Sequence, residues 1–268
     1  MQSANRLLRT LKTDTPAYGG WQMLPGTNLT RTLCRSSPYI SWLLVDLEHG
    51  NISDDGMHEI VAAAAACGVS PIVRVPEDSG AHGILVPVVE SVGDVEKVVR
   101  ASRFPPKGNR GFESLLAIEK FVQHIPCGGV RELTGREYLE QADESLVIAV
   151  QIETKGAFDA VEEIAAVDGV DVLFVGPFDL GIAIGHPVRA DGGYDIELVR
   201  AIQRVSEAAK NAGKISEIYC DSGEQGRRYA DQGFRMISVM TDMVGLKQVF
   251  RGAFAHAVED ISQPYGGM

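Results

Sequence analysis

Two carboxylates stand near the ends of two short apolar runs. Glu153 closes the run that begins at Leu146, and Asp179 follows the run that begins at Val172. Each run is short enough for a buried strand, and in a parallel α/β barrel the carboxyl ends of all strands open onto one face. Two acids there could hold a hard divalent cation and leave positions open for a substrate. Alternatively, either acid simply caps the helix that follows, since acids favour helix starts.

A histidine and an aspartate stand at the end of another apolar run, Leu43-Leu-Val-Asp46. His49, just past this predicted strand, is a candidate general base because the usual histidine pKa lies near neutrality. Asp46 could hold the imidazole ring in one tautomer and stabilise the imidazolium. The competing interpretation is a loop histidine beside a helix-capping turn.

Three further features could bind an anion. Arg74 lies in a β-branched strand, where an arginine is costly to bury unless it is paired or binds an anion. Gly176 begins a segment whose backbone N–H groups could cradle a small carboxylate at a helix start, although Pro177 removes one donor. Arg110 could bind an acidic substrate tail or belong to a plain tight turn.

The elements that must position these residues alternate between strands and helices. Eight strands are predicted, at 18–23, 42–46, 71–75, 83–88, 146–153, 171–176, 214–219 and 236–240. Helices are predicted at 28–35, 53–66, 92–102, 156–166, 196–212, 224–232 and 246–258. This alternation favours βα units. We therefore expect an α/β protein with a (β/α)8 TIM barrel, as a single domain over 1–268 with its core at about 18–258.

One unit of this barrel departs from the pattern. Only residues 76–82 separate the predicted third and fourth strands, whereas a crossover between parallel strands needs about ten residues or more. Either one of the two strands is misplaced, or the helix between strands 3 and 4 is missing. Further helical pieces are predicted near 115–123 and 136–141, and a solvated helix over 1–12.

Composition narrows the class of protein. A chain of 268 residues suits one α/β barrel. The formal charge of −11 argues against nucleic acid as a partner, and no apolar run reaches the length of a membrane span. Four scattered cysteines without a Cys-x-x-Cys pair favour reduced thiols in a cytoplasmic protein over a disulfide framework or a zinc site.

Six motifs occur in a fixed order along the chain. They are Asp46-Leu-Glu-His-Gly, Val73-Arg-Val-Pro, Gly83-Ile-Leu-Val-Pro-Val-Val-Glu, Pro105-Pro-Lys-Gly-Asn-Arg-Gly, Gln151-Ile-Glu-Thr and Gly176-Pro-Phe-Asp-Leu. With these motifs the chain resembles the HpcH/HpaI aldolase/citrate lyase family, from about Tyr18 to Asp242. Its members include metal-dependent (class II) pyruvate aldolases such as 4-hydroxy-2-oxoheptanedioate aldolase and 2-keto-3-deoxy sugar-acid aldolases.

The resemblance implies a role for each candidate residue. Glu153 and Asp179 would bind Mg²⁺, Mn²⁺ or Co²⁺. His49, oriented by Asp46, would be the base, and Arg74 would bind the keto oxygen and stabilise the enolate. The residues expected to bind the substrate are Arg74, Gln151, Gly176 and Pro177. The implied enzyme is a lyase of aromatic or sugar-acid catabolism that cleaves a 4-hydroxy-2-keto acid into pyruvate and an aldehyde, and it would be a homo-oligomer, a hexamer or similar.

The chain also departs from the family pattern. About one helix is missing after Glu77, Glu113 stands where a second glycine is usual, and Ser216-Glu217 replaces small residues near the seventh strand. None of these changes removes a candidate catalytic side chain. Two alternatives therefore stay open: a degenerate, non-catalytic relative with a disrupted barrel, and a related lyase that acts on acyl-CoA thioesters.

Overall fold

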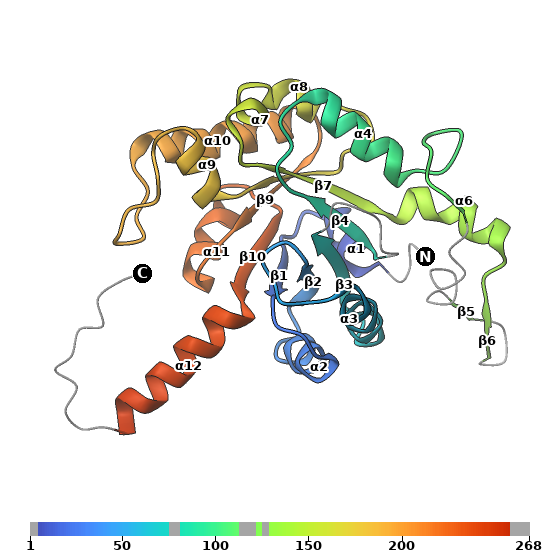
Figure 1. Ribbon diagram of the computed structural model, residues 1–268, viewed down its shortest axis with the longest axis horizontal. Coiled ribbons are helices and arrows are strands. Elements are labelled where there is room, and N and C mark those ends of the chain that lie inside the picture. Colours follow the sequence, from blue (N-terminus) through green and yellow to red (C-terminus); the bar gives the residue numbers. More distant parts are fainter. Residues whose placement is uncertain (1–4, 75–80, 113–121, 125–128, 258–268) are drawn as a thin grey trace.

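Eight parallel strands close a barrel in the computed structural model, which describes residues 5–74, 81–112, 122–124 and 129–257 (Figure 1). Their order around the barrel is β1-β10-β9-β8-β7-β4-β3-β2. The strands are β1 (Ala17–Gln22), β2 (Ile40–Asp46), β3 (Ser70–Arg74), β4 (Gly83–Val86), β7 (Val147–Ile152), β8 (Val172–Val175), β9 (Ile215–Tyr219) and β10 (Met236–Thr241). All eight predicted strands, and with them the TIM-barrel fold, are confirmed.

Helices follow most of the strands and cover the outside of the barrel (Figure 1). They are α1 (Arg6–Leu11), α2 (Thr27–Arg35), α3 (Asp54–Ala66), α4 (Val92–Ser102), α6 (Gly135–Ser145), α7 (Lys155–Asp159), α8 (Val161–Ala165), α9 (Pro177–Ala183), α10 (Ile196–Asn211), α11 (Gly223–Asp231) and α12 (Asp242–Ala257). The helix predicted at 156–166 is two helices, because Ala160 leaves the helical conformation (φ −101°, ψ 22°).

The strands bury side chains on both faces, as central strands of a parallel barrel must. Inward residues such as Trp42, Leu44 and Phe174 form one apolar cluster inside the barrel. Outward residues of the same strands pack against the helices in a second cluster, where Leu173 and Val175 meet residues of α8 and α10. This arrangement holds the carboxyl ends of the strands in fixed positions at one mouth of the barrel.

The third and fourth strands are neighbours despite their short connection. Ile72 pairs with Gly83 and Arg74 with Leu85 in parallel register, so neither strand was misplaced. This close pairing requires a glycine at position 83, because a Cβ there would lie only 2.7 Å from the Ile72 side chain. The helix predicted to be missing would fall largely on residues 75–80, which lie outside the described residues.

The N-terminal helix α1 is not the solvated helix that the sequence suggested. Leu7 is fully buried, and Asn5, the N-cap of α1, is 1% exposed. The Asn5 amide donates to the carbonyl oxygens of His82 (3.0 Å) and Ser145 (2.8 Å), which stand at the amino ends of β4 and β7. The helix therefore closes the barrel at the end opposite to the mouth.

Two short antiparallel strands, β5 (Val122–His124) and β6 (Val130–Glu132), form a hairpin that the sequence did not predict. The helical piece predicted near 115–123 lies mostly on residues outside the described part. The piece predicted near 136–141 is confirmed as the longer α6, which begins with a capping box between Thr134 and Glu137.

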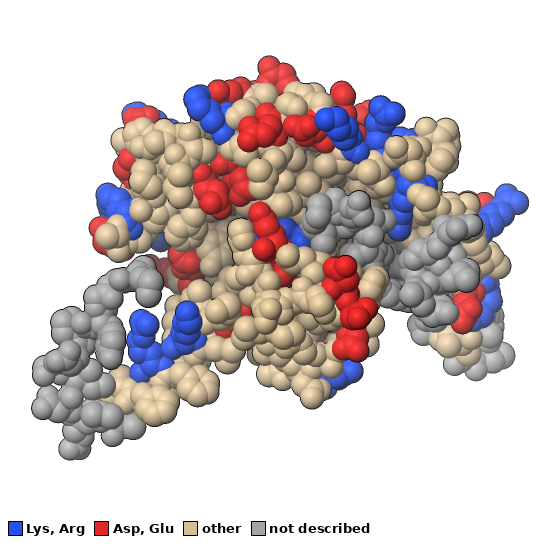
Figure 2. All heavy atoms as spheres, viewed as in Figure 1, with Lys and Arg blue, Asp and Glu red and all other residues tan. Residues whose placement is uncertain are grey.

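The surface carries mixed charge and one exposed apolar helix. On the face seen in Figure 2, Lys and Arg side chains are interspersed with Asp and Glu, as on a solvated surface rather than a basic strip. Helix α12 extends away from the barrel (Figure 1), and several of its apolar side chains are exposed. Within the described residues, every helix is too short or too polar to cross a membrane.

Candidate active site at the barrel mouth

A cavity of about 180 Å³ lies at the carboxyl ends of the strands. Its lining consists of Trp21, Met23, Asp46, His49, Arg74, Gln151, Phe174, Gly176, Pro177, Phe178, Asp179, Tyr219 and Thr241. Seven of the nine residues that the sequence singled out for a site belong to this lining, and an eighth, Glu153, directly follows β7. The ninth, Arg110, is not part of the lining and donates to the Tyr138 hydroxyl at 3.1 Å. The structure thus gathers residues from distant parts of the chain at one place.

Arg74 is the buried cation of this cavity, and its position is fixed on every side. Its Nε and Nη2 donate to the two carboxylate oxygens of Asp46 at 2.9 and 2.6 Å, a bidentate pair. Its Nη1 lies 3.0 Å from Glu48 Oε2, and the guanidinium stands 4.5 Å from the centre of the Trp21 ring. Of the two alternatives that the sequence left open for Arg74, the ion pair is present; Arg74 also lines the cavity, and its binding of an anion stays a prediction.

Asp46 does not contact the imidazole ring as the sequence suggested. Besides binding Arg74, its Oδ1 accepts the backbone N–H groups of Glu48 (3.0 Å) and His49 (3.1 Å). The His49 side chain is 58% exposed, and its Nε2 lies 3.9 Å from Glu48 Oε2. The physical reason is charge. The buried Asp46 carboxylate pairs with the Arg74 guanidinium, which neutralises it, and the His49 ring lies on the exposed side of the short turn.

Glu153 is 7% exposed and held by two donors. Its Oε1 accepts the Val88 backbone N–H at 2.8 Å, and its Oε2 accepts the Gln151 side-chain amide. Val88 has a positive φ of 54°, a strained conformation for a β-branched residue. Gly176 leaves room here, since a Cβ would lie 2.9 Å from Gln151 Nε2 and 3.3 Å from Glu153 Oε2.

Negative charges converge around Glu153. Burial raises the pKa of Glu153 to about 7, and the nearby charges of Asp179 and Glu48 raise it further, whereas the Val88 N–H and Arg74 lower it. Repulsion between neighbouring carboxylates in a partly buried site favours the protonated form of one of them. A cation placed among them would favour the ionised form instead.

The donor set fits a hard divalent cation. Glu153 and Asp179 supply carboxylate oxygens, which Mg²⁺ and Mn²⁺ prefer. The Gln151 Oε1 atom, beside Glu153, is buried and has no hydrogen-bond partner among the described residues, so it could accept from a cation-bound water. No group of three or more His, Cys, Asp or Glu in the described part of the chain is arranged to hold a metal. The remaining ligands would therefore be substrate oxygens and water.

Sequence reasoning missed several residues that shape the cavity. Glu48 was seen only as part of a motif, yet it contacts Arg74 and acts electrostatically on Glu153. Trp21 and Tyr219 stand at the ends of β1 and β9 and contact each other edge to face at 5.6 Å. Their positions at strand ends were a usable signal, because all such ends meet at the mouth.

Comparison with known proteins places the chain in a family. The family model for HpcH/HpaI aldolase/citrate lyase matches residues 29–247. The chain is 33% identical to a hydroxypyruvate/pyruvate aldolase of Delftia acidovorans over 91% of this chain and 89% of that one. It is 32% identical to a 5-keto-4-deoxy-D-glucarate aldolase of Enterobacter sp. over 93% of each.

Solved structures agree with this relationship. A HpcH/HpaI aldolase/citrate lyase family protein from Burkholderia cenocepacia superimposes with a TM-score of 0.81 at 29% identity, covering 96% of this chain and 99% of that one. The likeness extends over the whole barrel, including the strands that carry the cavity residues. The chain therefore belongs to the HpcH/HpaI aldolase/citrate lyase family and is a carbon–carbon lyase of the aldolase type.

Proposed function

We propose that the protein is a metal-dependent aldolase that cleaves a 4-hydroxy-2-keto acid into pyruvate and an aldehyde, or runs the reverse addition. The observation that carries the proposal is the convergence on one mouth of a candidate base (His49), a fixed cation (Arg74) and two carboxylates (Glu153 and Asp179). These are the groups that such a cleavage needs: one to take a proton, and others to stabilise the negative charge that develops.

The cavity residues divide the work of the reaction. Glu153 and Asp179 would hold a divalent cation, which would supply Lewis-acid polarisation of the keto group. His49 removes the proton of the C4 hydroxyl, the C3–C4 bond breaks, and its electron pair moves into the enolate of pyruvate as the aldehyde leaves. The proton held on His49 then returns to C3 and completes pyruvate. Arg74, fixed by Asp46, places positive charge near the enolate oxygen.

The substrate class follows from the lining and the relatives. The keto-acid end of the substrate would bind near Glu153, to Gln151, Gly176 and Pro177. All three residues line the cavity, and Gln151 and Gly176 lie next to the Glu153 carboxylate. The relatives named above act on pyruvate-derived and sugar-acid compounds by name, which supports a hydroxylated keto acid of aromatic or sugar-acid catabolism, such as 4-hydroxy-2-oxoheptanedioate or a 2-keto-3-deoxy sugar acid.

A pyruvate-release assay tests the proposed reaction. A panel of 4-hydroxy-2-keto acids would be incubated with purified protein after treatment with a chelator, and Mg²⁺, Mn²⁺ or Co²⁺ would then be added back. We expect release only after metal is restored. Full activity in the chelated protein would contradict metal dependence, and the absence of pyruvate from every substrate of the panel would contradict the reaction itself.

We also propose that the protein is a homo-oligomer, a hexamer or similar, assembled through α12. This helix exposes Leu246, Val249, Phe250 and Phe254, of which Val249 is 70% and Phe254 65% exposed. Contiguous exposed apolar side chains on a helix that leaves the barrel are typical of a subunit contact (Figure 1).

The free thiols of Cys34, Cys67 and Cys220 fit the proposed cytoplasmic location.

Sedimentation velocity distinguishes this assembly from a monomer. The wild-type chain should sediment as a multiple of 28.9 kDa, and Phe250→Asp with Phe254→Asp should reduce it toward the single chain. Arg251→Asp, on the same helix, is the matched control for added negative charge. A wild-type monomer at micromolar concentration would contradict the proposal.

A further inference from the structure

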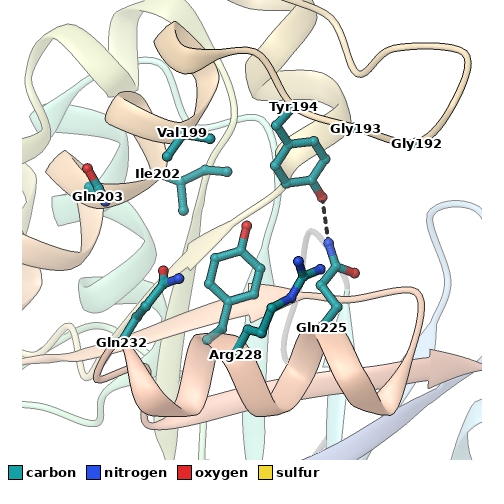
Figure 3. A pocket seen from close by; sticks show the side chains of 10 residues that line it. Gly192, Gly193, Tyr194, Val199, Ile202, Gln203, Gln225, Arg228 and Gln232 are labelled. Carbon is teal, nitrogen blue, oxygen red and sulfur yellow. Dashed lines mark hydrogen bonds between the residues drawn. The ribbon is translucent and has the colours of Figure 1, made fainter.

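A second cavity, of about 290 Å³ and here called the outer cavity, is lined by residues outside the barrel strands and shares no lining residue with the cavity at the mouth (Figure 3). It is bounded by the loop that carries Tyr194, by α10 and by α11, and none of the residues that line it is acidic. That lining contrasts with the formal charge of −11 of the whole chain. Its volume lies near the lower end of the range for small-molecule sites, roughly 300–1,000 Å³.

Arg228 is the cation of this outer cavity. Its guanidinium points from α11 toward the cavity (Figure 3), and it acts electrostatically on both Tyr194 and Tyr229. Within the described part of the chain, no carboxylate lies at ion-pair distance from it. By contrast, Arg204 on α10 is bound by Glu162 in two hydrogen bonds, of 2.9 and 2.7 Å. A guanidinium without an ion-pair partner in the described part of the chain, in a cavity whose lining holds no acid, is suited to an anion.

The hydroxyl of Tyr194 is oriented as a donor by its neighbours. Gln225 Oε1 accepts the Asp221 backbone N–H at 2.8 Å, which fixes the amide with Nε2 toward the Tyr194 hydroxyl at 3.1 Å. The phenol oxygen is the acceptor in that bond, so its own proton is left for another partner. Burial and, to a smaller extent, the charge of Asp221, which is not part of the lining, raise the pKa of Tyr194 to about 12, and the hydroxyl therefore keeps its proton at neutral pH.

Apolar groups and a second phenol complete the hollow. Ile202 of α10 is 1% exposed and, with Val199, provides an apolar wall. Tyr229 also lines the cavity, and its ring is held edge to face against Phe234 at 5.2 Å. Burial raises the pKa of the Tyr229 hydroxyl, so it too remains a neutral donor. Donors at one end and an apolar wall at the other match a ligand with an anionic head and an apolar body.

We propose that this outer cavity binds a small organic monocarboxylate with a planar or aromatic body. The carboxylate would accept from the Arg228 guanidinium and the Tyr194 hydroxyl, and the body would lie between Val199, Ile202 and the Tyr229 ring. A metal cation is disfavoured because no acid lines the cavity. A nucleic-acid strand is disfavoured because a single guanidinium cannot follow a phosphate backbone.

Calorimetric titration with benzoate tests the site, with benzamide as its neutral isostere. We expect benzoate to bind to the wild-type protein and benzamide to bind at least tenfold more weakly, because a charge-assisted hydrogen bond is lost. Arg228→Gln should weaken benzoate binding at least tenfold, and Tyr194→Phe should weaken it by a smaller factor. Arg227→Gln removes the same charge from the adjacent position of α11, outside the cavity lining, and should leave binding unchanged.

Three outcomes would overturn the proposal. The first is the absence of benzoate binding to the wild-type protein at millimolar concentration. The second is equal weakening by Arg227→Gln and Arg228→Gln, which would indicate general charge attraction. The third is full binding in Arg228→Gln, which would place the ligand elsewhere, for example at the barrel mouth. Because the Arg228 side chain is exposed on α11, the variant should fold, and its unfolding temperature would verify this.

Discussion

Two buried glutamates of the barrel, Glu153 and Glu217, show what separates a site from an isolated buried acid. Glu217 points into the barrel from β9, with strand partners Met236 and Phe174 whose side chains belong to the inner apolar cluster. It is fully buried, and neither carboxylate oxygen has a hydrogen-bond partner in the described part of the chain. Tyr219, two residues further along the strand, reaches the mouth, so Glu217 lies one layer below it.

Burial raises the pKa of both carboxyls, to about 7 for Glu153 and well above the usual value for Glu217. Of the two, only Glu153 has other acids within electrostatic reach and donors on both oxygens. For Glu217, desolvation is the whole cause of the raised pKa. A raised pKa alone therefore does not mark a functional site; the convergence of charged groups at an opening does.

The most direct test of this comparison is to replace each glutamate with glutamine in turn. Glu153→Gln should lower metal-dependent pyruvate release by about 10³-fold or more, because the variant loses a metal ligand and with it several kcal/mol of charge stabilisation. Glu217→Gln is the matched control, since it makes the same substitution at another buried glutamate of the barrel. It should leave the rate within a few-fold of wild type.

Equal losses in the two variants would mean that the barrel tolerates neither change, and the contrast between the two positions would then be wrong. Asp179→Asn provides a second arm, with an expected loss as large as that of Glu153→Gln. An active Asp179→Asn variant would remove Asp179 from the proposed ligand pair while leaving Glu153 to be judged by its own result.

The next largest effect is expected at His49, the exposed member of the mouth. His49→Ala should lower kcat by about 10²-fold, the usual contribution of a general base, while the affinity for Mn²⁺ stays unchanged. Rate measurements and a calorimetric Mn²⁺ titration on the same preparation separate the two roles. A variant that loses Mn²⁺ binding along with turnover would make His49 a ligand rather than a base.

The sequence predicts the positions of some of these site residues better than those of others. The eight strands and the positions of Arg74, Glu153 and Asp179 at one mouth follow from apolar periodicity and from the rule that parallel strands share their carboxyl end. The partner of Asp46 does not follow from spacing. A turn of three residues puts His49 nearby in sequence, but the neighbouring strand β3 brings Arg74 closer, at paired register positions.

Other features depend on contacts between distant segments. Val88 has a strained conformation and donates its N–H to Glu153, 65 residues away along the chain. No local sequence motif predicts this conformation. The burial of α1 results from the Asn5 amide reaching carbonyl groups at the far ends of two strands. A pattern of apolar and polar residues describes what a segment can bury, not which distant partner it meets.

A smaller effect is expected from metal binding to the wild-type protein. Mn²⁺ at about 100 times its Kd, with pyruvate, should raise the free energy of unfolding by about 2.7 kcal/mol, and Glu153→Gln should abolish the gain. A metal ligand must be deprotonated. Because the pKa of Glu153 is raised to about 7, the stabilisation should increase as pH rises toward 7 and level off above it. A gain that is equal at pH 5.5 and pH 8 would contradict this ligand assignment.

The smallest effect should come from replacing Glu217 with Met, a residue of similar volume that needs no hydrogen bond. Removal of an unsatisfied buried carboxyl should raise the free energy of unfolding at pH 7 by about 1 to 2 kcal/mol. Because the folded-state pKa of Glu217 is raised, its proton-linked contribution to stability is fully present below about pH 4.5 and is lost as pH rises toward the folded value.

The advantage of Glu217→Met over wild type should therefore grow between pH 5 and pH 8, as measured by urea unfolding at both values. Glu217→Gln separates the two causes, because its amide cannot ionise yet still lacks a partner. It should remove the pH dependence that Glu217 contributes while remaining less stable than Glu217→Met. If wild type proves the most stable of the three at pH 8, the carboxylate has a binding partner inside the barrel, and Glu217 would then resemble Glu153 more closely than their surroundings indicate.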